Sequence, residues 1–512
     1  MTETIMLMGT SSHVGKSILA TALCRIFHQE GRRVVPFKAQ NMALNSYVTK
    51  EGGEMGRAQV AQAEAAGLSP FVDMNPVLLK PTGNSCSQVI VDGKSIGNMS
   101  AREYHKGKSV QLFGHVTAAL ARLQQQFDTI VIEGAGSPAE INLKDDDIVN
   151  MRVAKYLQAP VLLIADIDRG GSLAALVGTL ALLDDEERAL VKGLIINKFR
   201  GDVTLMAPAV DFLEQKTGKP VLGIVPYLEH LGIDDEDSVS LEDKELEAEK
   251  QKKELRLAVI ETPKISNFTD FDALSDEPDA EVVYVRDAEE LRSLAPDVIL
   301  LPGSKNTTED LLYVRESGIE RAVRQLVGQG TPLVGICGGY QMLGEEIADP
   351  HHTESAHDAV QGLGYLPMKT VFAEEKRTVQ VTADCPGMEF YDGVLMGKQL
   401  RGYEIHMGRT EFTAEVRHPF HLTRQGERAI NAWDGALSED GRIFGTYLHG
   451  LFDHDGFRRQ FLNILRRQKG LRPLPVQRNR HLEKERAYDR LAETVRRSLD
   501  MEKLAAIMEG RA

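Results

Sequence analysis

The 512-residue sequence has only four cysteines, Cys24, Cys86, Cys337 and Cys385, which stand far apart and form no CxxC pair. This spacing indicates neither a disulfide framework nor a zinc site, and it fits a reducing cytoplasm. No apolar run approaches the roughly 18 residues that a membrane-spanning helix needs. The N-terminus, MTETIMLMGT, also lacks the basic segment of an export signal. We therefore expect a cytoplasmic protein that does not enter a membrane.

Basic charge is scarce as well. The chain has 60 Lys and Arg against 75 Asp and Glu, a net charge of −15, which opposes binding to nucleic acid over most of the surface. An anionic ligand must therefore find a local basic pocket. With 42% hydrophobic and 26% charged residues the composition is that of a folded globular protein, and the length predicts about three domains, or two large ones.

Short apolar runs followed by helical patterns predict two α/β halves. The strands expected in the first half are 5–8, 129–132, 161–165 and 194–196, with a helix over 17–29. This alternation is typical of a doubly wound domain, in which ligands bind at the carboxyl ends of parallel strands. The strands expected in the second half are 257–260, 298–301, 333–336 and 443–448. We therefore predict a second α/β domain.

An acidic run, residues 234–254, separates the two halves. It holds ten acidic and four basic residues and almost nothing to bury, which is typical of a solvated linker. The predicted organisation is a domain over 1–230, an acidic linker over 231–255, a domain over 256–470 and a helical tail over 471–512. In the tail, Tyr488, Leu491, Val495 and Leu499 recur at the spacing of an amphipathic helix that packs on the protein itself.

The first strand runs into the segment GTSSHVGKS, which opens a helix. Main-chain N–H groups between Gly9 and Gly15, including that of Thr10, can wrap phosphate oxygens. Lys16 can reach the β- and γ-phosphates of ATP, and the Ser17 hydroxyl can bind Mg²⁺. Five rather than four residues separate the two glycines. In this respect the loop resembles that of dethiobiotin synthetase and its relatives, which phosphorylate carboxylates.

Two further strand ends fit a nucleotide site. Glu133, in VIEGAGSP, is placed to hold Mg²⁺ directly or through water. Asn197 and Lys198 close the segment GLIINK and are predicted to frame a purine. For Asn197 the cap of a loop is an open alternative.

The second half offers a nucleophile. The segment PLVGICGGYQMLG places Cys337 between a buried strand and a helix, with small neighbours that permit a sharp nucleophile elbow. His449, in GTYLHGLFD, follows another strand and can act as the base. The N–H groups of Gly303, in LLPGSKNT, and Gly338 can hold an oxyanion.

These pieces resemble the class I glutamine amidotransferase domain, which releases ammonia from glutamine through a Cys–His pair. In most of that family a glutamate follows the histidine by two residues, whereas Leu451 occupies that place here. The third member of the catalytic group therefore stays open: a backbone carbonyl or another residue orients the imidazole.

A synthetase-type ATP domain joined to such an amidotransferase is similar to the cobyrinic and cobyric acid amide synthases. The stretches closest to the cobyric acid branch are FKAQNMALNSYVT, EMGRAQ, MNPVLLKPTGNSCSQVI, ADIDRGG, PKISNFTDFDAL and GYEIHMG. The resemblance implies a ligase that amidates the b, d, e and g carboxylates of adenosylcobyrinic acid a,c-diamide for cobalamin biosynthesis. It would use ATP, Mg²⁺ and glutamine, with an ATP-binding synthetase domain over 1–230 and a glutamine amidotransferase domain over 256–470.

A polyanionic corrinoid requires cations and polar groups in this net-acidic chain. We predict that Lys38, Arg57, Lys80 and Arg169 contact carboxylate or phosphate groups, with surface salt bridges as the alternative. The predicted contacts of amide or nucleotide groups are Gln40, Asn41 and Asn45.

Several further points bear on the function. Glu404 and His406, in GYEIHMG, share one face of a predicted strand, where either a structural or a catalytic role fits. Ser11 stands where partition-type ATPases carry a signature lysine, which disfavours a switching ATPase. An a,c-diamide synthase, or a ligase for another large acid such as a cell-wall lipid precursor, is the alternative function. A homo-oligomer is also left open.

Overall fold

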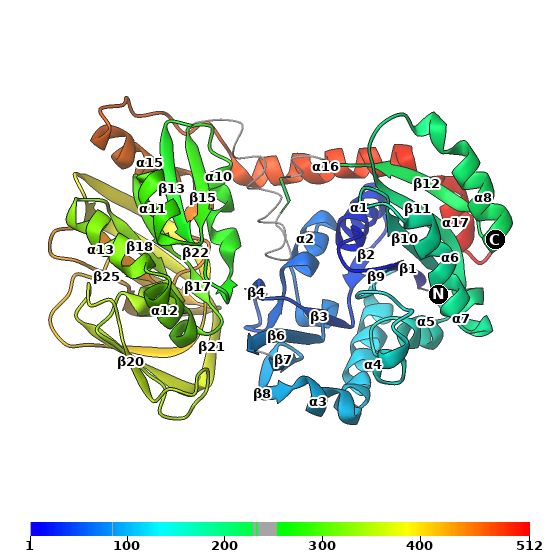
Figure 1. Cartoon of the computed structure of the whole chain (residues 1–512), viewed down its shortest axis with the longest axis horizontal. Coiled ribbons are helices and arrows are strands. Elements are labelled where there is room, and N and C mark those ends of the chain that lie inside the picture. The colour runs from blue at the N-terminus through cyan, green and yellow to red at the C-terminus, as the bar shows by residue number, and fades with distance from the viewer. Residues whose placement is uncertain (1, 84, 229–231, 234–252, 512) are drawn as a thin grey trace.

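The computed structural model describes all residues except 1, 84, 229–231, 234–252 and 512. Most of the predicted acidic linker, 231–255, therefore lies outside the described residues. Figure 1 shows two lobes side by side, with the first twelve strands in one lobe and the later strands in the other.

The N-terminal lobe is built on a six-stranded parallel sheet. Its order is β12 (Val221–Pro226), β11 (Val191–Phe199), β10 (Val161–Asp166), β1 (Glu3–Gly9), β9 (Thr129–Glu133) and β2 (Val34–Phe37). The central strands are buried along nearly their whole length, as in sheets covered on both faces. The predicted doubly wound α/β domain is confirmed.

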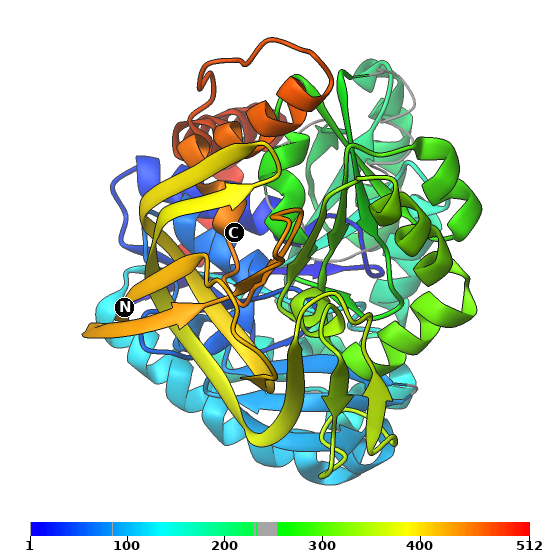
Figure 2. The same ribbon diagram turned by 90° about the vertical axis from the view of Figure 1, so that its left-hand side faces the viewer.

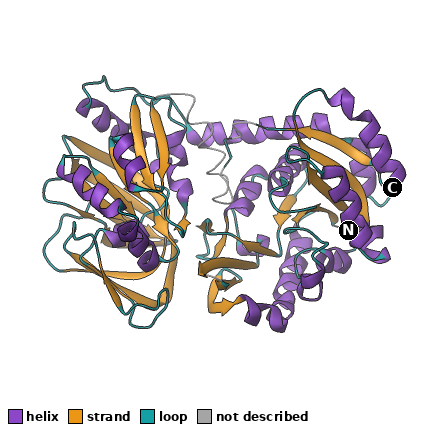
Figure 3. Ribbon diagram, viewed as in Figure 1, coloured by secondary structure: helices purple, strands orange, loops and turns teal. Residues whose placement is uncertain are grey.

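Alternate residues of β1 face two different cores. Ile5 and Leu7 pack with the first helix, α1, whereas Met6 and Met8 belong to the core on the other face. Figure 3 shows helices on both sides of this sheet. The helices of the lobe are α1 (Lys16–Gln29), α2 (Arg57–Ala65), α3 (Ala101–Glu103), α4 (Ser109–Gln126), α5 (Met151–Leu157), α6 (Ser172–Leu182), α7 (Asp185–Leu190) and α8 (Ala207–Thr217).

Two small sheets extend the N-terminal lobe towards the other lobe, and the apolar runs of the sequence did not predict them. One comprises β3 (Gln40–Met42), β6 (Val77–Gly83), β7 (Cys86–Val91) and β8 (Lys94–Ser100). The other pairs β4 (Ser46–Val48) with β5 (Glu54–Gly56). Several of these strands are only three residues long, too short to give a clear period.

The C-terminal lobe contains a second six-stranded sheet, which is parallel apart from its last strand. Its order is β15 (Ala280–Val285), β13 (Leu255–Ile260), β16 (Val298–Leu301), β18 (Leu333–Ile336), β26 (Ile443–Thr446) and β25 (Ala436–Leu437). The predicted strand 443–448 ends at Thr446, because the Leu448 N–H turns to the Thr446 hydroxyl (3.0 Å). The helices are α10 (Asp272–Ser275), α11 (Ala288–Leu294), α12 (Thr307–Glu316), α13 (Ile319–Gly328), α14 (Gly338–Met342) and α15 (Asp455–Gln468).

A further sheet of the C-terminal lobe is dominated by the long antiparallel pair β21 (Met368–Phe390) and β22 (Gly393–Phe412). Figure 2 shows these strands crossing the face of the lobe. Its other strands are β19 (Glu346–Ala348), β20 (Ala359–Gln361), β23 (Phe420–Gln425) and β24 (Arg428–Asp434). The pair reaches the N-terminal lobe, where the Gln380 amide donates to the Val48 carbonyl (3.0 Å).

The tail forms α16 (Arg480–Ser498) and α17 (Met501–Met508). Tyr488, Leu491 and Val495 join the core that contains α1, so α16 packs on the N-terminal lobe. Figure 1 shows α16 crossing from one lobe to the other. The apolar spacing predicts this helix but not the lobe that it covers. Within the described ranges, no helix is both long and apolar enough to cross a membrane.

Candidate active sites

The predicted phosphate loop lies between the end of β1 at Gly9 and the start of α1 at Lys16. The Lys16 ammonium donates to the carbonyls of Ser11 (3.0 Å) and Gly136 (3.2 Å), which holds it over the loop. Gly15 adopts a left-handed φ of 95°, where a side chain would be strained. The loop therefore has the conformation that allows main-chain N–H groups to face an anion.

The two residues at the end of β11, Asn197 and Lys198, both contact neighbouring residues of this region. The Asn197 amide donates to the Val14 carbonyl (2.8 Å), and a Cβ on Gly15 would lie 2.2 Å from the Asn197 Nδ2. Asn197 thus holds the phosphate loop in place. The Lys198 ammonium lies 3.0 Å from the Asp166 carboxylate at the end of β10. Both side chains lie at the carboxyl edge of the sheet, where the sequence placed them.

Glu133, at the end of β9, is the centre of a buried polar cluster beside this loop. Its Oε1 accepts hydrogen bonds from the Ser17 hydroxyl (2.8 Å) and the Lys38 ammonium (2.8 Å). Its Oε2 accepts from the amides of Gln62 (2.6 Å) and Gln59 (3.4 Å), which lie on α2. The sequence predicted Ser17, Lys38 and Glu133 but not the two glutamines.

The chemistry of this cluster fits a magnesium ion bound with a nucleotide. A hydroxyl and a carboxylate oxygen are ligands that Mg²⁺ prefers, and phosphates and water commonly complete its shell. The described residues contain no group of three or more His, Cys, Asp or Glu side chains that could hold a metal alone. A magnesium site in which phosphates supply some of the ligands does not require such a group of side chains.

The remaining predicted contacts of the N-terminal lobe are spread over its carboxyl edge. The Asn41 amide donates to Gln59 (2.9 Å), and the Gln40 carbonyl accepts from the Tyr104 hydroxyl. Arg57 lies over the ring of Tyr47, 5.4 Å from its centroid. Asn41 and Arg57 are buried. Arg169 is exposed in the loop that follows β10.

Cys337 lies at a strained turn between β18 and α14. Its φ of 51° and ψ of −106° are unusual for a residue other than glycine. The turn is held by a hydrogen bond from the Cys337 N–H to the Thr446 carbonyl (2.8 Å). A Cβ on Gly339 would lie 2.1 Å from the Leu301 carbonyl oxygen, so this position requires glycine. The geometry is that of a nucleophile elbow.

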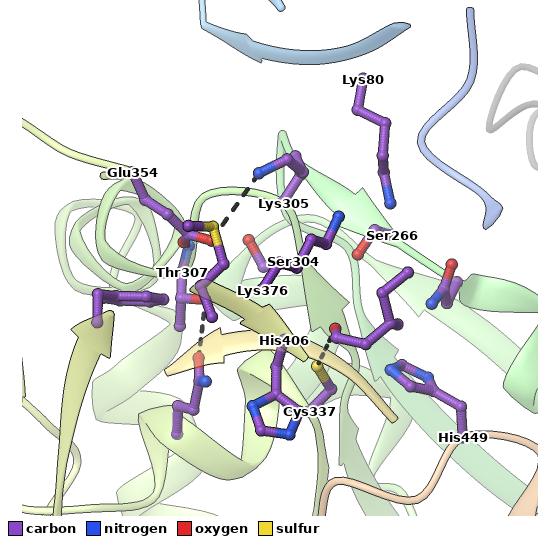
Figure 4. A pocket seen from close by; sticks show the side chains of 15 residues that line it. Lys80, Ser266, Ser304, Lys305, Thr307, Cys337, Glu354, Lys376, His406 and His449 are labelled. Atoms are coloured by element: carbon purple, nitrogen blue, oxygen red, sulfur yellow. Dashed lines mark hydrogen bonds and ion pairs between the residues drawn. The ribbon is translucent and has the colours of Figure 1, made fainter. Parts of the chain in front are cut away.

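Asp270, which precedes α10, contacts the catalytic histidine and occupies the third position of a Cys–His–Asp group, which the sequence pattern left open. Its carboxylate lies 2.7 Å from the His449 Nδ1 and accepts the Gly450 N–H (2.9 Å). Stacking on Tyr403, with centroids 5.0 Å apart, fixes the plane of the His449 ring. The Nε2 of His449 is buried and has no hydrogen-bond partner in the described part of the chain. Figure 4 shows this imidazole beside Cys337.

Charge favours the protonated form of His449. Burial by itself disfavours the imidazolium, but the Asp270 carboxylate and the neighbouring Cys337 raise the pKa of His449 to about 10. A cysteine, a histidine and an orienting carboxylate can together perform nucleophilic attack on an amide. The only sequence signal for Asp270 is its place in NFTDFD.

The two glycines predicted to hold an oxyanion flank this group. Gly303 lies in β17 (Gly303–Ser304), which pairs with β14 (Ile265–Ser266). A Cβ on Gly303 would lie 3.4 Å from the His449 Cε1. A Cβ on Gly338, the first residue of α14, would lie 2.7 Å from the Ser304 N. The fold thus brings both glycines to Cys337 and His449.

A cavity of about 30 Å³ adjoins Cys337 and His449, and the N-terminal lobe contributes Lys80 to its wall. Its volume suits a small polar group. Lys80 and Lys376, from β21, both bind the Glu54 carboxylate, at 2.8 Å and 2.6 Å. Burial opposes ionisation of Glu54, but the two ammonium groups hold its pKa well below the usual value. Burial also lowers the pKa of Lys376, to about 8. The predicted contact Lys80 therefore lies at the junction of the lobes.

Comparisons with known proteins match both lobes. Residues 5–241 match the family described as the CobQ/CobB/MinD/ParA nucleotide binding domain, and residues 256–457 match the CobB/CobQ-like glutamine amidotransferase domain. The chain is 55% identical to the cobyric acid synthase of Moorella thermoacetica, over 99% of this chain and 98% of the relative. It is 50% identical to that of Dehalococcoides mccartyi strain CBDB1, over 99% of each. For the protein of that name from Citrobacter koseri the identity is 51%, again over 99% of each.

Proposed function

Because the chain belongs to the cobyric acid synthase family, we propose that it amidates the b, d, e and g carboxylates of adenosylcobyrinic acid a,c-diamide. The product is adenosylcobyric acid, in cobalamin biosynthesis. The protein is a carbon–nitrogen ligase that uses ATP, with glutamine as the nitrogen donor and a corrinoid as the acceptor. The observation that carries this function is the pairing of a phosphate loop in one lobe with a Cys–His–Asp group in the other.

The N-terminal lobe activates the carboxylate. A carboxylate is a poor electrophile, and transfer of the γ-phosphoryl group of ATP converts it to an acyl phosphate. The loop from Gly9 to Gly15 binds the phosphates through its main-chain N–H groups, apart from that of Thr10, which donates to the Ile164 carbonyl (2.9 Å). Lys16 stabilises the charge of the transferred group. Ser17 and Glu133 would hold Mg²⁺. The ion, when bound, neutralises part of the phosphate charge.

The C-terminal lobe supplies ammonia. Cys337 attacks the carboxamide of glutamine as a thiolate, and His449 holds the thiol proton as an imidazolium and passes it to the departing nitrogen. Asp270 orients His449, and the N–H groups of Gly303 and Gly338 stabilise the oxyanion. Water then hydrolyses the thioester. Ammonia attacks the acyl phosphate in the other lobe and displaces phosphate.

The remaining assignments belong to the same proposal. Lys38, Gln40, Asn41, Arg57, Lys80 and Arg169 contact the corrinoid or the phosphates, and Asn197 and Lys198 lie next to the purine. Their support is the position of most of them at the carboxyl edge of the N-terminal sheet and in the adjoining small sheets. The acidic net charge supports a protein without a nucleic-acid partner. The four free cysteines support a cytoplasmic location. Association into a homo-oligomer stays a proposal.

The experiment that tests the function is incubation of the protein with the a,c-diamide, ATP, Mg²⁺ and glutamine. Mass spectrometry of the corrinoid is expected to show one amidation at each of the b, d, e and g carboxylates. Omission of ATP or of glutamine is expected to stop the reaction. No change in the mass of the a,c-diamide would contradict the proposed substrate. Cobyrinic acid in a parallel incubation tests the alternative, and its amidation at a and c alone would support an a,c-diamide synthase.

Asp270→Asn is expected to reduce the glutamine-dependent kcat by at least about 100-fold, because the amide cannot hold the imidazolium of His449 as a carboxylate does. The pH profile should also change. Asp270 raises the pKa of His449, so its loss lowers that pKa, and the alkaline fall in activity should begin at a lower pH. Ammonium-dependent synthesis should be retained. The measurement is kcat with each nitrogen source from about pH 6 to about pH 10.

Asp272→Asn, two residues further in the same motif, is the matched control and should leave both profiles near those of the original protein. An Asp270→Asn protein with an unshifted alkaline limb and a normal glutamine-dependent kcat would reject the orienting role.

A further inference from the structure

A second histidine, His406 of β22, lies in the wall of the cavity that contains Cys337. Its Nδ1 lies 2.7 Å from the Gly408 carbonyl, which accepts hydrogen bonds only, so Nδ1 carries the hydrogen. The ring stacks on Tyr447, with centroids 3.8 Å apart. The orientation of this imidazole is therefore fixed from two sides.

The other ring nitrogen of His406 is left with an unused lone pair. Nε2 is buried and has no hydrogen-bond partner among the residues that the structure describes. Burial also keeps the ring neutral, lowering the pKa of His406 to about 3, with a smaller contribution from Arg377 and His449. A buried acceptor without a donor is costly. Its presence beside a nucleophile therefore points to a ligand with an N–H or O–H group.

Two other side-chain acceptors that line this cavity, on Gln341 and Glu354, already accept hydrogen bonds. The Gln341 carbonyl oxygen accepts from the Thr307 hydroxyl (3.1 Å), and Glu354 accepts the Thr307 N–H (3.3 Å) beside the Lys305 ammonium. The lysines around the cavity are donors. A carboxamide placed against Cys337 with its oxygen at the glycine N–H groups would still have two N–H groups to satisfy.

We propose that the Nε2 of His406 accepts an N–H of the glutamine carboxamide and then an N–H of the ammonia released from it. This inference rests on the proposed amidase role of Cys337. Figure 4 shows Cys337 between the two imidazoles, with His406 on the side opposite His449. The two histidines thus have different roles at the leaving nitrogen. His449 transfers a proton to it, and His406 accepts a hydrogen bond from one of its N–H groups.

The step balances without a further reactant. The Cys337 Sγ forms a bond to the carboxamide carbon, the C–N bond breaks, and the proton on the His449 Nε2 goes to the departing nitrogen. His406 neither gives nor takes a proton. Ammonia is therefore held without being converted to ammonium, and it stays nucleophilic for the acyl phosphate.

The test compares the hydrolysis of glutamine with that of glutamate γ-methyl ester, which has no carboxamide N–H groups. His406→Phe keeps a ring for the stack on Tyr447 but removes the acceptor. It should lower kcat/KM for glutamine hydrolysis about tenfold and change ester hydrolysis less than about twofold. His406→Gln, which retains an acceptor, should restore most of the glutamine activity.

His418→Phe is the matched control, because His418 makes the same type of contact, from Nδ1 to the Gly435 carbonyl (2.7 Å), in the same lobe. It should change neither hydrolysis reaction. Equal losses with amide and ester in His406→Phe would mean that His406 only supports the fold, and unchanged glutamine hydrolysis would also overturn the proposal. If the original protein hydrolysed neither substrate, the amidase function itself would fail, which is a distinct result.

Discussion

Lys16→Ala is expected to reduce corrinoid amidation by about 1000-fold or more with either glutamine or ammonium as the nitrogen source. The Lys16 ammonium lies over the phosphate loop, held by the Ser11 and Gly136 carbonyls. Without it, the charge that develops during phosphoryl transfer loses its nearest cation. Because activation of the carboxylate precedes attack by ammonia, the origin of the ammonia makes no difference. The measurement is amide formation by mass with each nitrogen source.

Lys216→Ala, at an exposed position in α8, is the control for the loss of one lysine and should retain full activity. Synthesis by the Lys16→Ala protein at saturating ATP, at a rate near that of the original protein, would show that this loop is not the site of activation.

Cys337→Ser and His449→Ala are expected to eliminate glutamine-dependent synthesis, since each removes a partner of the thioester step. Free ammonia enters after that step. At alkaline pH and high ammonium concentration, Cys337→Ser should therefore amidate the corrinoid at a rate near that of the original protein, with an unchanged affinity for ATP. Both nitrogen sources are measured for both variants.

The control for the cysteine is Cys86→Ser, in β7 of the other lobe, which should retain synthesis from both sources. Equal loss with glutamine and ammonium, in Cys337→Ser protein shown to be folded, would mean that Cys337 is structural or that the lobes cannot be uncoupled. The assignment of ammonia release to the C-terminal lobe and of carboxylate activation to the N-terminal lobe would then be wrong.

The parallel sheets could be predicted from the sequence because their strands are continuous apolar runs. The runs at 298–301 and 333–336 coincide with β16 and β18. The long pair β21 and β22 mixes buried and exposed residues and contains register shifts. A regular period is therefore interrupted, and only the short stretch with Glu404 and His406 was identified as strand-like.

The residues of the candidate sites also fall into two groups: those that local sequence patterns predict and those that only the tertiary fold brings together. Lys16, Cys337 and His449 belong to local patterns of strand, turn and helix that can be identified in one stretch of sequence. Asp270 meets His449 across 179 positions of the chain, and no local spacing relates the two. Lys38 and Lys80 could be identified as cations, but their buried carboxylate partners, Glu133 and Glu54, are set by the tertiary fold.

The position of α16 bears on how this protein can be divided into pieces. A fragment that ends at the acidic linker would lack Tyr488, Leu491 and Val495, which complete the core around α1. It would also lack Leu499 and Asp500, whose backbones pair with Gly223 and Leu222 at the edge strand β12. The complementary fragment would carry the apolar face of α16 with nothing to cover it. A soluble ATP-binding half therefore requires the last helices supplied in trans or joined by circular permutation.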